Sequence, residues 1–418
     1  MKKIFKKILI SLISITLVIA AVDILWINMP KLTSRKDIDD IEKYSSKVED
    51  LSIDKNTKVI GLGEATHGNI EFQDLKLEVL KDLVENHGLK SFALETDFGE
   101  GLMINNYIHG DKKDENISKI FSFEIYHTEN MNKLINWMFD YNQTIKDDKD
   151  KLSFYGIDIQ NPEKSIEIIT EFCKSNGILT NENLEKKFSF INDQDYEISK
   201  IKENEDLLKN IKSQIDNLKT NEAKLLSRSI VNILDSVNYY EGDINDYLKM
   251  NNMRDKYMAN NTKWISDFEK NKGNNLILIS GHNVHIAKEG KLFKTLGSNL
   301  KDIFNDSYKA IGTDFYKSTV NINIVGPDYS RSNQTFTSAN PLAYQAKKFG
   351  GTYLLNFETI KEGKTHSIIS SDNYMGSLGE GYSPIMKLIP TNYRSKDKAI
   401  NLYDSMIFIY EAHPIKIL

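Results

Sequence analysis

Cysteine and proline are scarce in this chain of 418 residues, and each scarcity excludes a class of structure. Cys173 is the only cysteine, so the chain can form neither an internal disulfide nor a zinc site built from cysteines. Seven prolines argue against long disordered linkers. A chain of this length can bury a sizeable core without disulfides. We therefore expect a protein that hydrophobic packing stabilises.

An excess of positive charge is also absent. The formal net charge is -5, and the charged residues are spread along the chain rather than gathered in blocks. Proteins that bind nucleic acids usually carry a basic stripe or a basic domain. We therefore expect no nucleic-acid partner, and the sequence leaves the oligomeric state open.

The long apolar run is confined to the N-terminus. Four lysines precede the apolar residues 8–22, a pattern that is typical of an export signal. Either a signal peptide is cleaved near Ala20, or residues 8–27 form an uncleaved membrane anchor that includes Asp23. We favour the anchor, and a buried helix is the third interpretation. With either export segment, the rest of the chain lies outside the cytoplasm, on the cell membrane or secreted.

Strands and helices alternate after this segment. Residues 58–65 and 90–97 read as buried strands, and residues 71–86 between them carry a helical stripe of apolar residues. Alternation of this kind is typical of parallel βαβ units. The sequence therefore predicts an α/β fold with a central, mostly parallel sheet flanked by helices. Further buried strands are expected at 152–159, 275–282, 308–315, 319–325, 352–357 and 405–412.

Several helices are expected outside this alternation. Ile38, Ile41 and Val48 have helical spacing, so residues 34–51 are predicted to form an amphipathic helix. Residues 131–143 and most of 184–240 also read as helical. We expect an export or anchor segment over 1–32 and one domain over 33–418, with a helical insertion at about 165–262 that packs on the sheet.

Acids and imidazoles follow four of the predicted strands. Ligands of open α/β sheets bind beyond the carboxyl ends of the strands, so these residues should meet at one edge. The alternative is that a polar residue at a strand end only caps the next helix, an interpretation that weighs most for Asp97 and Asp158. The residues at the four strand ends are Glu64 with His67, Glu95 with Asp97, Asp158, and His282 with His285.

These residue types can activate water. A neutral imidazole can take a proton from water, and a carboxylate on its other nitrogen fixes the tautomer. A covalent mechanism would need an activated nucleophile, and the chain has no G-x-S-x-G motif. The related "GSLG" at 376–379 does not follow a clear strand, and Cys173 lies on a predicted helix. The sequence therefore favours attack by water over a nucleophilic serine or cysteine.

A divalent metal ion is an open alternative. His67, His282 and His285, together with Glu64 or Glu95, could ligate zinc. The spacing is E-x-x-H, however, and the H-E-x-x-H spacing of zinc proteases is absent. The remaining histidines lack an acid at telling spacing, and we interpret them as structural or surface residues: His87, His109, His127, His366 and His413.

Eight segments in order resemble the motifs of the erythromycin esterase family. They extend over most of the chain after about residue 35, and their order makes the resemblance specific, whereas each motif alone would be weak. The segments are "GEATHG", "FALETD", "NNYIHG", "NWMFDYN", "GIDIQ", "MRDKYMANN", "GHNVHIAK" and "YDSMIFI".

The resemblance implies hydrolytic opening of a macrolide lactone by activated water, without a cofactor. His67 would be the general base, and Glu64 and Glu95 would hold the water or tune the base. His282 and His285 would polarise the carbonyl or bind the substrate.

The resemblance also implies that Arg254 steadies the developing oxyanion. Asp97, at the end of the second predicted strand, is expected in the substrate-binding set with Arg254 and His285. The expected partner is a small-molecule ester or lactone, with the membrane as a second partner through the N-terminal segment. The family's resistance enzymes are cytoplasmic, whereas this chain carries an export segment. A metal-dependent hydrolase of another bond, or a non-catalytic envelope protein that retains the fold, are the alternatives.

Overall fold

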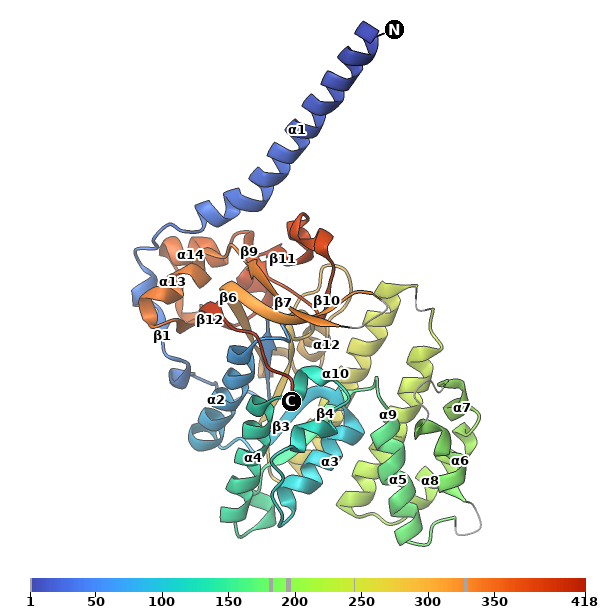
Figure 1. The fold of residues 1–418 in the computed structure, drawn as a ribbon. Helices are drawn as coiled ribbons and strands as arrows, with labels where there is room; N and C mark the ends of the chain where they lie inside the picture. The colour runs from blue at the N-terminus through green and yellow to red at the C-terminus, as the bar shows by residue number, and fades with distance from the viewer. Residues whose placement is uncertain (1, 180–182, 193–196, 244, 327–329) are drawn as a thin grey trace. The chain divides into compact units, whose positions relative to one another are not determined.

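The computed structural model describes residues 2–179, 183–192, 197–243, 245–326 and 330–418. The chain forms two compact units. Unit 1 comprises Met1–Asp50, Glu64–Phe72 and Gly312–Ile415, and unit 2 comprises Leu51–Gly63, Gln73–Ile311 and Lys416–Leu418. Strands β2 (Val59–Glu64) and β6 (Tyr308–Ile324) contribute residues to both units. The architecture is a mixed, mostly parallel sheet flanked by helices, so the predicted fold class is confirmed (Figure 1).

Unit 2 contains the parallel part of the sheet. Its strand order is β6-β2-β5-β3-β4, and the β6–β2, β5–β3 and β3–β4 pairs are parallel. Strands β2 to β5 are buried at every residue, as expected for continuous apolar runs covered on both faces. The bounds are β3 (Ser91–Asp97), β4 (Ser153–Asp158) and β5 (Ile277–His282), which confirms three predicted strands.

The predicted helices next to these strands are present. α2 spans Ile70–His87 and α4 spans Glu129–Thr144, close to the predicted bounds. α3 (Phe98–His109) packs against β4 across Gly101, where an added Cβ would lie 1.9 Å from the backbone nitrogen of Gly156. Two glycines therefore allow a helix and a strand to approach closely. The short α11 (Asn283–Ile286) and α12 (Leu296–Phe304) complete this part of unit 2.

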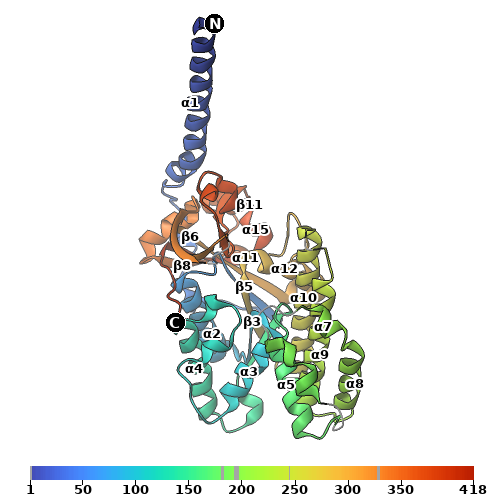
Figure 2. The ribbon, with the colours of Figure 1, turned by 45° about the vertical axis from the view of Figure 1, so that its right-hand side comes forward.

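A helical region of unit 2 has an apolar core of its own. Ala223, Leu226, Ile230, Ile233 and Val237 repeat at helical spacing along α9 and are all buried. Figure 2 shows α5, α8, α9 and α10 side by side. The predicted helices are thus found, while the insertion bounds of 165–262 stay a prediction. The bounds are α5 (Glu163–Ser175), α6 (Leu184–Lys187), α7 (Ser199–Lys202), α8 (Glu205–Asp216), α9 (Asn221–Tyr240) and α10 (Tyr247–Asn271).

Unit 1 contains the mixed part of the sheet. The order is β1-β8-β12-β6, and β7 and β10 also pair with β6, antiparallel and parallel respectively. A separate antiparallel pair consists of β9 and β11. The strands are β1 (Ser45–Ser46), β7 (Arg331–Thr337), β8 (Thr352–Asn356), β9 (Asn373–Gly376), β10 (Gly381–Tyr382), β11 (Arg394–Asp397) and β12 (Ser405–Ala412). Its short helices are α13 (Pro341–Gln345), α14 (Gly363–Ile369) and α15 (Ala399–Leu402).

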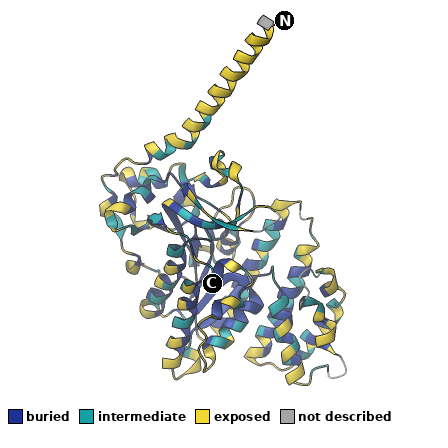
Figure 3. Ribbon diagram, viewed as in Figure 1, coloured by how far each residue is buried: buried dark blue, intermediate teal, exposed yellow. Residues whose placement is uncertain are grey.

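The N-terminal segment is one helix, α1 (Lys2–Thr33). Most of its described residues are exposed, as the colouring of Figure 3 shows. The part Ile4–Thr33 is long and apolar enough to cross a membrane, and a signal sequence would meet the same criterion. At its end, the carbonyls of Ile27 and Lys31 accept hydrogen bonds from Arg394 and Tyr316 of unit 1.

Two predictions about secondary structure were wrong. Residues 34–51 do not form a helix, because Asp40 binds Thr365 and the strand β1 pairs with β8, and these tertiary contacts override the helical spacing. The strands expected at 308–315 and 319–325 are one strand, β6. Lys317 and Ser318 between them continue the ladder with β7 instead of forming a turn.

Candidate functional site

The turn after β2 holds an acid–imidazole pair in unit 1. His67 Nδ1 lies 2.8 Å from Glu64 Oε1. Only 2% of the Glu64 side chain is exposed, against 13% of the His67 side chain. A carboxylate at Nδ1 selects the tautomer with its proton on that nitrogen, so that Nε2 carries the lone pair. The pair has the arrangement of an oriented general base.

Buried hydrogen bonds fix the backbone of this turn. The Nδ2 of Asn69 donates to the carbonyl oxygens of Thr319 and His413, over 2.8 and 2.9 Å. Its Oδ1 accepts from the hydroxyls of Thr66 and Ser318. The fully buried Asn69 amide therefore uses its two donor hydrogens and accepts two hydrogen bonds. The turn is held by its surroundings as well as by its own residues.

Gly68 is required by close packing. An added Cβ would lie 2.0 Å from the backbone oxygen of Asn321. The carbonyl oxygen of Gly68 accepts hydrogen bonds from the backbone nitrogens of Asn321 and Ile415. A larger residue would separate these strands from the turn, so the second glycine of the motif has a structural reason.

A loop of unit 1 whose position was not predicted from the sequence lies against this turn. The N–H of Leu378 donates to the carbonyl oxygen of Ala65, and Leu378 also forms a bridge with Thr66. The "GSLG" segment begins at the last residue of a short strand, β9, which corrects the expectation that it does not follow a clear strand. Its strand was missed because β9 is four residues long and only two of those are fully buried.

Glu380, in the same loop, is an electrostatic neighbour of the pair. Its carboxylate binds the guanidinium of Arg331 and accepts from Asn323 Nδ2 over 3.2 Å. Burial raises the pKa of Glu380, while the charges of Arg331 and His67 oppose that rise. Glu380 therefore places a second carboxylate near His67, and no local spacing in the sequence could have shown this.

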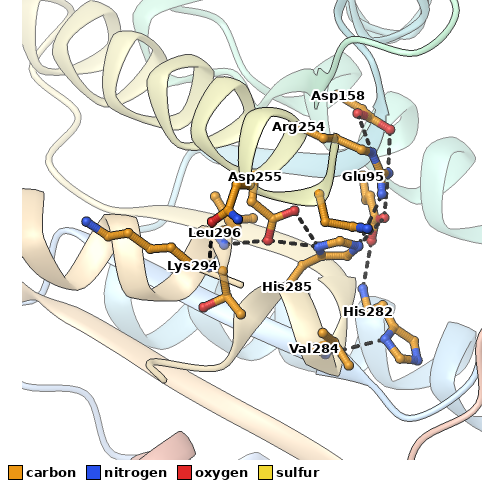
Figure 4. A network of polar contacts seen from close by, with 12 residues as sticks. Glu95, Asp158, Arg254, Asp255, His282, Val284, His285, Lys294 and Leu296 are labelled. Atoms are coloured by element: carbon orange, nitrogen blue, oxygen red, sulfur yellow. Dashed lines mark hydrogen bonds and ion pairs between the residues drawn. The ribbon is translucent and has the colours of Figure 1, made fainter. Parts of the chain in front are cut away.

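A network of charged residues occupies unit 2 (Figure 4). Glu95 lies near the end of β3 and only 6% of its side chain is exposed. Its Oε1 accepts from Arg254 Nη2 over 2.8 Å, and its Oε2 accepts from the backbone N–H of His282 over 2.7 Å. These two contacts fix both oxygens of the carboxylate in one orientation.

Arg254 reaches three partners from α10. Its Nε and Nη2 donate to the two oxygens of Asp158 over 2.9 and 2.6 Å, a geometry that only an arginine provides. Its Nη1 lies 3.2 Å from His285 Nε2. Burial lowers the pKa of Arg254, but the charges of Asp158 and Glu95 outweigh burial and raise it. Asp158 is thus an arginine partner at the strand end, and its side chain is fully buried.

His285 lies between carboxylates. Its Nδ1 is 2.8 Å from Asp255 Oδ1, and its Nε2 is 3.4 Å from Glu95 Oε1. Burial lowers the pKa of His285, but the charges of Asp255 and Glu95 outweigh it, so that the pKa is raised. Asp255 Oδ2 also accepts from the backbone N–H of Leu296 over 2.6 Å. Asp255 follows Arg254 directly in the sequence, but no sequence pattern identified it as a site residue.

His282 caps the short helix α11. Its Nδ1 accepts from the N–H of Val284 over 3.3 Å, so the proton of the neutral ring lies on Nε2. An added Cβ on Gly281 would lie 2.7 Å from Glu95 Oε2, so this glycine makes room for the carboxylate. His282 is therefore oriented as a hydrogen-bond donor.

Asp97 has the role of a helix cap. It is fully buried, and its Oδ1 accepts from the N–H of Gly99 over 2.8 Å and from the hydroxyl of Ser165 over 3.2 Å. Burial, followed by the charge of Glu100, raises its pKa well above the usual range. This geometry favours the capping interpretation of Asp97 over contact with a substrate.

The structure brings together Glu64 with His67, and Glu95 with Arg254, His282 and His285. That these two sets meet at one edge of the sheet stays a prediction. Among the described residues, no group of three or more histidine, cysteine or acidic side chains is arranged to hold a metal ion.

Comparisons with known proteins place the chain in a family. The family model described as erythromycin esterase matches residues 84–412. Erythromycin esterase type II of Escherichia coli is 25% identical over 297 residues, which cover 62% of this chain and 70% of that protein. YbfO of Bacillus subtilis (strain 168), provisionally described as a hydrolase, is 25% identical over 298 residues, 61% of this chain and 63% of its own length.

Solved structures share the fold. A protein from Bacillus cereus has a TM-score of 0.73 and 20% identity, with 90% of this chain and 97% of that chain covered. A mutant of the erythromycin esterase EreC in its open conformation has a TM-score of 0.60 and 16% identity, with 87% and 92% covered. The family model of erythromycin esterase spans more than half of the sequence. The chain belongs to the erythromycin esterase family.

Proposed function

We propose that this protein hydrolyses an ester or lactone with a water molecule that His67 activates. The observation that carries the proposal is the 2.8 Å contact between His67 Nδ1 and the buried carboxylate of Glu64. Membership of the erythromycin esterase family supports the reaction class.

The proposed mechanism uses one imidazole twice. His67 Nε2 takes a proton from water while the resulting hydroxide attacks the carbonyl carbon. The imidazolium that forms is stabilised by the Glu64 carboxylate on Nδ1. The tetrahedral intermediate then collapses, the carbon–oxygen bond of the alcohol breaks, and His67 returns the proton to the leaving oxygen. A lactone would open to a hydroxy acid in this way.

The charge network of unit 2 suggests supporting roles. Arg254 gives three of its donor groups to Asp158, Glu95 and His285, so we assign it to positioning Glu95 and His285 and no longer to the oxyanion. We assign His282, whose Nε2 bears the proton, to hydrogen bonding with the carbonyl oxygen of the substrate. A donor aimed at a developing oxyanion typically contributes about 2.7–4 kcal/mol.

A macrolide is the first substrate to test. Erythromycin esterase type II of Escherichia coli is among the relatives, and we extend that substrate class to this chain as a proposal. A metal ion is less compatible with His285, because the Arg254 guanidinium 3.2 Å from its Nε2 would repel a divalent cation. Dialysis against EDTA should therefore leave the rate unchanged. Loss of activity that zinc restores would favour the metal-dependent alternative.

The test of the function compares two histidine variants of unit 1. Purified protein is incubated with a panel of macrolides and simple lactones, and mass spectrometry detects the gain of one water. We expect His67→Asn to lose about 10²–10⁴-fold in rate, the usual contribution of a general base. His366→Asn, on α14 of the same unit, should retain the wild-type rate. Turnover by His67→Asn at the wild-type rate would contradict the mechanism.

We also infer that α1 anchors the protein with its lysines on the cytoplasmic side. Protease added to intact cells lacking an outer barrier should then digest the region after residue 33. Protection of that region in intact cells, and digestion only after lysis, would contradict the inference.

A further inference from the structure

A pocket of about 410 Å³ opens among three helices of unit 2, and none of its lining residues is among those assigned above. Its lining comes from α8, α9 and the second half of α10. The volume lies within the range of about 300–1,000 Å³ that is usual for small-molecule sites. The residues that matter to the argument are Lys212, Asp216, Lys224, Arg228, Trp264 and Phe268.

The guanidinium of Arg228, one of the cations that line this pocket, is held in place by the side-chain amide of Asn261. Arg228 Nε and Nη2 both donate to Asn261 Oδ1, over 2.9 and 2.6 Å. Within the part of the chain that the structure describes, its Nη1 makes no hydrogen bond and no carboxylate forms an ion pair with the guanidinium. Asp235, on the same helix, acts on Arg228 only through its charge. Arg228 is thus an oriented, half-buried cation with a donor group to offer.

The wall of the pocket is aromatic. The Trp264 ring stacks on Phe268 with centroids 5.0 Å apart and 11° between the planes. Phe98 contacts Trp264 edge-on at 6.0 Å. The indole is therefore held on its neighbours and suits a flat apolar ring as ligand.

The acidic residues of the lining are paired with lysines. Asp216 lies 2.7 Å from Lys212 Nζ, and Asp267 binds Lys263. Among the described residues, the side chain of Lys224 forms a hydrogen bond only with the amide oxygen of Asn221, over 3.4 Å. Two cations without a carboxylate partner in the described chain, Arg228 and Lys224, thus remain beside the aromatic wall, and this balance favours an anion.

We propose that this pocket binds a small aromatic carboxylate, with the carboxylate on Arg228 and the ring against Trp264. None of the lining residues takes part in the proposed hydrolysis, so the proposal does not depend on the proposed function. Arginine binds carboxylates through strong, charge-assisted hydrogen bonds, and an aromatic wall adds area for a flat ring.

The test uses isothermal titration calorimetry on the full-length protein in detergent. The probes are 2-naphthoate, the uncharged 2-naphthylmethanol with the same ring system, and acetate with the charge alone. We expect 2-naphthoate to bind at least about tenfold more tightly than 2-naphthylmethanol, and acetate to bind more weakly still. This comparison needs only the wild-type protein.

Two variants locate the site. Arg228→Gln should abolish the preference for 2-naphthoate over 2-naphthylmethanol, whereas Lys209→Gln, which removes an exposed charge of α8 outside the lining, should keep it. The proposal is overturned if wild-type protein does not bind 2-naphthoate, if both naphthyl probes bind equally, or if folded Arg228→Gln keeps the wild-type preference.

Discussion

Two carboxylate–imidazole pairs of this chain, Glu64–His67 and Asp255–His285, have the same inner contact and different surroundings. In both, a carboxylate oxygen lies 2.8 Å from Nδ1. The Nε2 of His285, however, is directed at Arg254 and Glu95, and its pKa is raised by carboxylates that outweigh burial. The comparison teaches that a carboxylate on Nδ1 does not by itself identify a base: in the Asp255–His285 pair the second ring nitrogen belongs to a charge network.

The largest effect should come from breaking the network at its centre. Arg254→Met leaves Asp158 and Glu95 buried without their cation, which typically costs about 3–5 kcal/mol. Urea unfolding should show this loss in the free energy of unfolding. Lys263→Met, on the same helix with an exposed ion pair, should lose at most about 0.5 kcal/mol. A loss below about 1 kcal/mol for Arg254→Met would show that the network does not stabilise the fold.

The second prediction concerns the catalytic pair itself. Glu64→Gln keeps the shape of the side chain but removes the charge that would stabilise the imidazolium, so the rate should fall by roughly 100-fold with little change in stability. Glu71→Gln is the matched control, because Glu71 Oε1 lies 2.6 Å from His413 Nδ1 in the same unit. Equal rates for the two variants would sink the assignment of Glu64.

The third prediction uses the pH dependence of stability. The folded-state pKa of His285 is raised, so the stability from its protonation is present below about pH 6.5 and is lost as the pH rises through the folded value. Asp255→Asn removes a charge partner and should flatten that loss by about 1 kcal/mol between pH 6 and pH 9. Asp267→Asn on the same helix should keep the wild-type slope. An unchanged slope in Asp255→Asn would contradict the role of Asp255.

The smallest effect should come from Glu380. Removing its charge in Glu380→Gln makes the imidazolium of His67 less favourable, so the acidic limb of the pH–rate profile should move to lower pH by less than about one unit. The amide can still accept from Arg331, which should preserve the loop. Glu362→Gln removes an exposed charge of the same unit and should leave the profile unchanged. A shift to higher pH would reverse our view of Glu380.

The sequence predicted features that depend on local periodicity or on strand ends. Continuous apolar runs located β2 to β5, and the polar residue after each run located Glu64, Glu95 and His282. Strand β7 was missed because Arg331–Thr337 is polar and only one of its residues is fully buried.

Contacts between residues that are distant in the chain produce no such local pattern in the sequence. Glu380 lies 313 positions after His67, and His413 meets Glu71 across 342 positions. Asp255 was overlooked because helical spacing does not indicate which distant residues a helix contacts. Arg254 binds Asp158 at the end of one strand, whereas its neighbour Asp255 binds His285 after another. The family resemblance identified Arg254, whereas only the structure shows that Arg254 is the centre of a charge network.

The side-chain amides beside Arg228 can adopt only one orientation. Asn261 Oδ1 accepts from a guanidinium, which can only donate, so its Nδ2 must donate to Ile157 O and to Asn232 Oδ1. Asn232 Nδ2 must then donate to the carbonyl of Asp158 and to the Asp97 carboxylate. A row of amides between an obligate donor and obligate acceptors has one polarity, and no member can flip alone. The hydrogen bonds of this region of unit 2 therefore all run in one direction. They lead from Arg228 at the aromatic pocket to Asp158 at the end of β4, and the side chain of Asp158 binds Arg254.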